Sequence, residues 1–102
     1  MNRTYRKRSS TGGRGISPNT STKIWSRDKG LCIYCGRPAQ LLDHVIPFSD
    51  NSPTVASNLV CCCYSCNSWR GKHPEDIELL TKAILWLNEH GENTDWMDTF
   101  YG

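Results

Sequence analysis

The sequence predicts a small α+β domain in which two strands and a helix form the core and further helices flank them. A chain of 102 residues is long enough for one hydrophobic core and too short for two independent ones. Two apolar segments of strand character, residues 41–47 and 58–63, are separated by a loop of Ser, Asp, Asn and Pro. Only 37% of the residues are hydrophobic, and a domain with so thin a core usually needs a disulfide or a bound metal for stability.

Helical signals precede and follow the two strands. Residues 20–29 are expected to form a short helix, with Thr20 or Ser21 as its N-cap and Gly30 as its stop. After the second strand, a helix is expected near residues 64–70.

Gly71 is expected to end that second helix. Pro74 and two following acidic residues then open the clearest helix of the chain, which should stop at Gly91. Its apolar residues recur at helical spacing and are expected to pack across the core: Ile77, Leu79, Leu80, Ala83, Ile84, Trp86 and Leu87.

Composition divides the chain into a basic disordered arm at residues 1–19, a folded domain at 20–91 and an acidic aromatic tail at 92–102. Residues 1–29 carry eight Lys or Arg and one Asp, whereas residues 75–102 carry seven acids and one Lys. A basic arm suits a nucleic-acid partner, because cationic side chains displace counterions from phosphates, and it equally suits a solubilising role. The tail either folds back onto the core or docks a partner.

The N-terminal residues are basic and polar without a following apolar segment, so no signal peptide is predicted. No stretch approaches the roughly 20 apolar residues of a membrane span. We therefore expect a reducing, cytoplasmic compartment and no membrane partner. Clustered cysteines in such a compartment more often bind metal than form disulfides.

The stretch CCCYSCN, residues 61–67, holds four of the six cysteines. Two C-x2-C pairs, separated by 27 residues, are typical of a structural zinc site with four thiolate ligands, whereas a redox dithiol or a buried pair is the alternative. The predicted ligands are Cys32, Cys35, Cys63 and Cys66. Cys61 and Cys62 should lie on opposite faces of the strand, where one or both pack as small hydrophobic residues.

Three polar residues are not explained by zinc. Asp43 and His44 interrupt an apolar strand, and Asn67 follows Cys66 on the predicted helix, about 100° around its axis. Carboxylate and amide oxygens suit Mg²⁺ or a similar hard cation. His44, with an ordinary pKa of about 6.5, could accept a proton from water at neutral pH.

Residues 27–72 resemble the HNH endonucleases of the His-Me finger (ββα-metal) superfamily, whose core is treble-clef-like. The resemblance rests on the pattern D-H-x13-N-x8-N framed by both C-x2-C pairs. It implies that His44 is the general base, that Asp43 and Asn67 bind one catalytic Mg²⁺ or Mn²⁺, and that Asn58 braces the loop that orients His44. Many members have His where this chain has Asn67, so the chain is an H-N-N variant.

The resemblance also suggests roles for residues at the end of the predicted helix. Arg70 and Lys72 stand where family members carry basic residues beside the scissile phosphate, and Arg70 is the stronger candidate for a catalytic cation. Trp69 either stacks on a base or packs in the core. His73 helps to begin the next helix or supplies a third metal ligand, and His90 suits the end of a helix without a catalytic role.

Together these features predict a metal-dependent endonuclease that hydrolyses DNA, most readily duplex DNA, in a bacterial or phage-infected cell. A zinc-knuckle module that binds nucleic acid without cutting it is the first alternative. The second is an adaptor that uses the acidic aromatic tail. A homodimer, or a partner protein bound through the tail, is also compatible with the sequence.

Overall fold

The computed structural model describes residues 15–101. Its helices and strands are α1 (Pro18–Arg27), β1 (Leu41–His44), β2 (Leu59–Cys62), α2 (Tyr64–Lys72), α3 (Ile77–Glu89) and α4 (Asp98–Tyr101). Short 3-10 helices lie at Phe48–Asp50, Ala56–Asn58 and Asp95–Met97. Most of the predicted basic arm, residues 1–14, lies outside the described residues.

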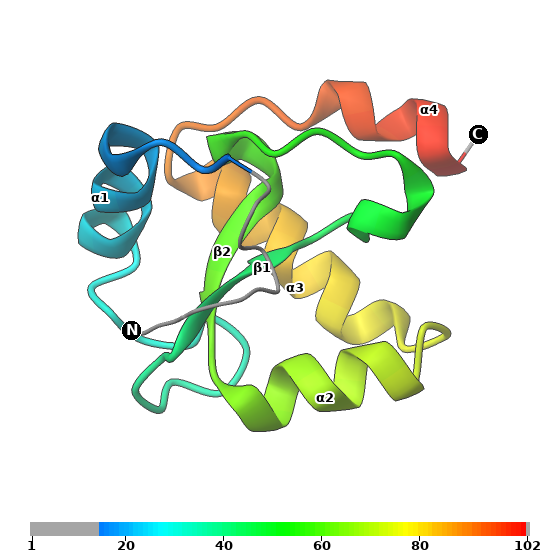
Figure 1. The fold of residues 1–102 in the computed structure, drawn as a ribbon. Helices are drawn as coiled ribbons and strands as arrows, with labels where there is room; N and C mark the ends of the chain where they lie inside the picture. The colour runs from blue at the N-terminus through cyan, green and yellow to red at the C-terminus, as the bar shows by residue number, and fades with distance from the viewer. Residues whose placement is uncertain (1–14, 102) are drawn as a thin grey trace.

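β1 and β2 form an antiparallel hairpin in which Leu41 pairs with Cys62 and His44 pairs with Leu59. In Figure 1 the hairpin occupies the centre, with α1 on one side, α2 at one end and α3 running behind it. The predicted α+β class with a two-stranded sheet and flanking helices is confirmed. β1 ends at His44, three residues before the expected limit, and the chain bends there into the long loop.

Successive residues of β2 face two separate hydrophobic clusters, because side chains alternate along a strand. Val60 and Cys62 belong to the larger cluster, which includes residues of α3 and of the first cysteine pair. Leu59 and Cys61 belong to the smaller cluster, in which they pack with Ile24 of α1. Cys61 and Cys62 are fully buried on opposite faces, as predicted.

α1 begins earlier than predicted. Ser17 is the N-cap, because its side chain accepts a hydrogen bond from the backbone N–H of Thr20, and Pro18 follows in the first turn, where its fixed φ suits a helix. The expectation that Thr20 or Ser21 caps the helix was therefore wrong. Gly30 does follow the helix end, with a φ of +68°.

The boundary between α2 and α3 also differs from the prediction. α2 continues through Gly71 to Lys72, because the backbone N–H of His73 still bonds to the carbonyl of Trp69. α3 begins only at Ile77, because Asp76 is the N-cap and accepts a hydrogen bond from the N–H of Leu79. Ile77, in the first turn, is 69% exposed, so it does not join the predicted apolar face.

The acidic aromatic tail folds back onto the core. Met97 is buried in the larger cluster, and the indole N–H of Trp96 donates to the Ser57 hydroxyl at 2.9 Å. Figure 1 shows the chain returning from α3 toward α4 past the end of the hairpin at which β2 begins. The residues up to Met97 therefore pack on the core, which is one of the two alternatives that the sequence left open.

A buried ion pair that was not predicted joins three elements. Arg27 donates to the Asp28 carboxylate, which also accepts the backbone N–H of Cys61 and the indole N–H of Trp86. Arg27 therefore supports the fold and does not extend the basic arm. Within residues 15–101, none of the helices has the length and apolar character that crossing a bilayer requires.

Candidate functional site

The four predicted zinc ligands converge. The Sγ atoms of Cys32, Cys35, Cys63 and Cys66 all lie within 4.8 Å of one another. Cys35 Sγ is 3.7 Å from Cys63 Sγ. Tetrahedral zinc with Zn–S bonds of about 2.3 Å requires sulfur atoms about 3.8 Å apart, so the cluster fits a four-thiolate zinc ion.

Local structure brings each pair to the cluster. Gly36, with a φ of +83°, closes a tight turn after Cys35, and its N–H bonds to the carbonyl of Cys32 at 2.8 Å. Cys63 is the N-cap of α2, and its sulfur accepts the N–H of Cys66 in the first helical turn. This cap explains why Cys63, and not Cys62, pairs with Cys66.

The thiols of the cluster differ in acidity. Burial raises the pKa of Cys32, but backbone hydrogen bonds around its sulfur outweigh burial and lower that pKa to about 7. Burial, together with hydrogen bonds among the thiols, raises the pKa of Cys66. Four adjacent thiolates repel one another, so a divalent cation supplies the charge that lets all four ionise.

A second site lies in a cavity of about 510 Å³ between β1 and α2. Asp43 and His44 line it from β1, and Asn67 and Arg70 line it from α2. The cavity is also lined by His73, by Leu80 of α3 and by Phe100 of α4. The structure thus brings together the predicted base, both predicted metal ligands and the predicted cation.

Asp43 accepts three side-chain hydrogen bonds. Its Oδ1 accepts the Asn67 amide N–H at 3.1 Å. Its Oδ2 accepts an N–H of Arg70 and, at 3.2 Å, the hydroxyl of Tyr34. Burial raises the pKa of the Asp43 carboxyl and prevails over the Arg70 guanidinium, which acts to lower that pKa. Burial likewise raises the pKa of Tyr34, so its hydroxyl retains the proton that it donates.

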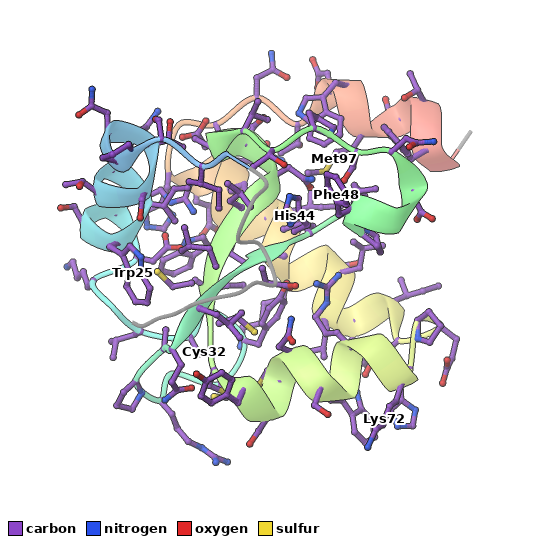
Figure 2. All side chains as sticks on the ribbon, viewed as in Figure 1. Trp25, Cys32, His44, Phe48, Lys72 and Met97 are labelled. Atoms are coloured by element: carbon purple, nitrogen blue, oxygen red, sulfur yellow. The ribbon has the colours of Figure 1, made fainter. Side chains whose placement is uncertain are left out.

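His44 occupies the last position of β1, beside the long loop. Figure 2 shows it next to Phe48, and the two rings meet edge to face with centroids 5.5 Å apart. The Nε2 of His44 lies 2.9 Å from the hydroxyl of Thr54. Thr54 was not predicted as part of the site, because no motif or spacing marks a threonine inside a polar loop.

Asn58 is fully buried and joins the two ends of that loop. Its Oδ1 accepts the N–H of Ile46 at 2.8 Å. Its amide N–H groups donate to the Ile46 and Pro53 carbonyls and to the Ser52 hydroxyl. Asn58 therefore fixes the segment that directly follows His44 and contains Thr54, although it does not line the cavity.

The remaining candidates lie at the end of α2. Arg70 donates to the carbonyls of His44 and Val45, and its side chain is largely buried. Trp69 is 49% exposed, so it is not a core residue; it stacks on His73 at 3.6 Å and donates to Asp76. Figure 2 shows Lys72 on the far end of α2 from Cys32.

The last histidine lies elsewhere. His90 stacks on Trp86 one turn earlier and bonds to its carbonyl through Nδ1, as suits a residue at a helix end. It does not line the cavity.

The oxygen donors of the cavity fit a small divalent cation. An amide can rotate by half a turn to exchange its oxygen and nitrogen, which would place Asn67 Oδ1 about where Nδ2 lies, 3.1 Å from Asp43 Oδ1. Adjacent ligands of octahedral Mg²⁺ at about 2.1 Å are about 3 Å apart. One carboxylate and one amide leave the remaining positions to water or phosphate oxygens.

Comparison with protein families supports the resemblance. Residues 32–73 match the family model described as HNH endonuclease. The match begins at the first zinc ligand, ends just after α2 and contains every predicted site residue. α1, α3 and the tail lie outside it. A search of curated proteins gave no match.

Proposed function

Because residues 32–73 match the family model described as HNH endonuclease, we propose that the protein is a metal-dependent endonuclease that hydrolyses phosphodiester bonds of duplex DNA. One observation carries the proposal: Asp43, His44 and Asn67 line a single cavity, where the Asn67 amide lies 3.1 Å from the Asp43 carboxylate. A module that only binds nucleic acid does not require this combination.

Asp43 and Asn67 would hold one Mg²⁺ or Mn²⁺, which when bound supplies Lewis-acid stabilisation of charge on the phosphate and the departing oxygen. His44 removes the proton from the attacking water. The Thr54 hydroxyl, bonded to Nε2, holds the imidazole in orientation, and Asn58 holds the loop that carries Thr54. A zinc ion held by the four cysteines would have a structural role, because four thiolates leave no open coordination position.

Cleavage of supercoiled plasmid tests the proposal. The wild-type chain should nick DNA with Mg²⁺ or Mn²⁺ and should be inactive with EDTA added just before the assay. His44→Ala should lose activity by about 10² to 10⁴-fold, the usual contribution of general-base catalysis. His90→Ala is the matched control, because His90 is the C-cap of α3 and does not line the cavity, and it should cleave like the wild type.

Each alternative predicts a different result in the same assay. Retarded plasmid without cleavage would establish the binding module, and equal cleavage by wild type and His44→Ala would refute the assigned base. No binding and no dependence on metal would favour the adaptor. Linear product before extensive nicking would favour a homodimer, which cuts both strands in one encounter, over a monomer.

A further inference from the structure

Tyr34 connects the first cysteine pair to the cavity. It lies between Cys32 and Cys35, and only 5% of its surface is exposed. Its hydroxyl reaches Asp43 Oδ2 at 3.2 Å. No pattern in the sequence marks Tyr34, because a tyrosine inside a C-x2-C pair has no fixed role.

Arg70, on α2, donates a hydrogen bond to the same Asp43 oxygen, Oδ2. Its guanidinium bonds to Asp43 Oδ2 and lies over the Tyr34 ring, with Cζ 5.2 Å from the centroid. The two carboxylate oxygens therefore have different partners. Oδ2 is bonded to Tyr34 and Arg70, whereas Oδ1, within residues 15–101, is bonded only to the amide of Asn67.

We propose that Tyr34 and Arg70 are positioning residues that hold Asp43 by Oδ2 and so present Oδ1, beside Asn67, as the single oxygen that binds the catalytic cation. The inference rests on the proposed function and deepens it. It means that Tyr34, between the two cysteines of the first C-x2-C pair, also supports the catalytic metal site. It also assigns Arg70 to the carboxylate, whereas the sequence favoured the scissile phosphate.

The physical reason is the freedom of a carboxylate to rotate about its last torsion. A ligand that coordinates through one oxygen loses affinity when that rotation is free, because the bound orientation must then be selected from many. Hydrogen bonds to the second oxygen remove this cost. Outer-shell partners of metal ligands typically contribute about 10 to 100-fold to metal affinity or activity.

Mn²⁺ binding to the full chain loaded with zinc tests the inference without reference to cleavage. Free Mn²⁺ is titrated by electron paramagnetic resonance against wild type, Tyr34→Phe and Tyr64→Phe. Tyr64 is an exposed tyrosine at the start of α2, so Tyr64→Phe is the matched control. Tyr34→Phe should raise the Mn²⁺ dissociation constant about 10-fold, and Tyr64→Phe should leave it unchanged, while zinc stays at one per chain.

Arg70→Lys is a second variant, because lysine keeps the charge but lacks the two-pronged donor geometry of arginine. It should weaken Mn²⁺ binding as well. An unchanged Mn²⁺ dissociation constant in Tyr34→Phe would overturn the inference, even if its thermal stability falls. If Asp43→Asn has the same Mn²⁺ dissociation constant as the wild type, no cation binds at Asp43. The proposed function then fails together with the inference.

Discussion

The cysteine cluster and the Asp43 cavity are two candidate binding sites that share helix α2, and they balance charge differently. Cys66 and Asn67 are neighbours on α2, yet one joins the thiol cluster and the other bonds to Asp43. The cavity already contains a cation, Arg70, which pairs with the Asp43 carboxylate. The cluster consists of four thiols whose full ionisation depends on a bound ion.

This difference indicates which site the fold depends on. Arg70 pairs with the Asp43 carboxylate and joins α2 to the end of β1 whether or not a catalytic metal binds. In the cluster, the first cysteine pair and the start of α2 bring together four sulfur atoms that repel one another when charged, and the backbone N–H of Ile33 adds one hydrogen bond to the Cys61 carbonyl of β2. We therefore expect zinc to stabilise the fold and the second cation to serve chemistry.

Removing zinc should produce the largest effect. Cys66→Ser, or prolonged incubation of the wild type with a strong chelator, should abolish the cooperative thermal transition, because zinc binding supplies folding free energy to small domains. Circular dichroism and metal analysis by mass spectrometry check this. Adding Mg²⁺ should not restore the transition, because thiolates prefer softer ions.

Cys61→Ala is the matched control for this prediction. Cys61 is a buried thiol that lies outside the cluster, and burial raises its pKa to about 12. The variant should keep one zinc per chain and lose only about 1 kcal/mol of unfolding free energy, as small cavities in a core do. A folded, zinc-free Cys66→Ser protein would show that the two sites do not differ as argued.

The two sites also differ in how well sequence predicts them. The cysteine cluster was fully predicted, because the x2 spacing places two thiols on one turn whatever the rest of the fold does. Asp43, His44 and Asn67 were predicted as a set through the family pattern, and they do share a cavity. Polar residues such as Asp43 and His44 have no structural reason to interrupt an apolar strand, so their presence there indicated a functional site.

The residues that support the cavity were harder to predict. Tyr34 and Thr54 contact Asp43 and His44 only after the knuckle and the loop fold over the hairpin, so no local spacing reveals them. Helix limits shifted for a related reason. Ser17 and Asp76 cap their helices through side-chain geometry, and several nearby residues had the same chemical ability.

Asn58→Ala should have an intermediate effect on stability and activity, and it should act on the loop beside His44. The change leaves the N–H of Ile46 without its side-chain partner and removes the donors to two carbonyls, so the free energy of unfolding should fall by about 3 kcal/mol. Urea unfolding measures this. Nuclease activity should fall further than stability alone explains, because the loop that carries Thr54 is released.

The control for this change is Asn19→Ala, which alters an exposed asparagine of α1. It should change the free energy of unfolding by less than about 0.5 kcal/mol. Both asparagine variants should keep one zinc per chain, since Asn58 contacts no residue of the cluster. Loss of zinc from Asn58→Ala would show that the two sites are coupled through the hairpin.

The turn between α2 and α3, whose residue Asp76 lines the cavity, gives the smallest expected effect. Asp76 accepts the indole N–H of Trp69 at 3.0 Å and caps α3, and these hydrogen bonds lower the pKa of its carboxyl. A carboxyl whose pKa is lower in the folded chain stabilises the fold above its unfolded pKa, about 3.9, and loses that contribution as pH falls through the folded value.

Asp76→Ala should therefore lower the melting temperature slightly at pH 7, and the difference from wild type should shrink as the pH falls below about 4. Asp76→Asn should lose less, because asparagine caps helices nearly as well as aspartate. Thermal melts of the three proteins between pH 3 and pH 7 measure the trend. A difference that grows toward low pH would contradict the sign of the pKa shift, and a change in zinc content would show that this turn is coupled to the cysteine cluster.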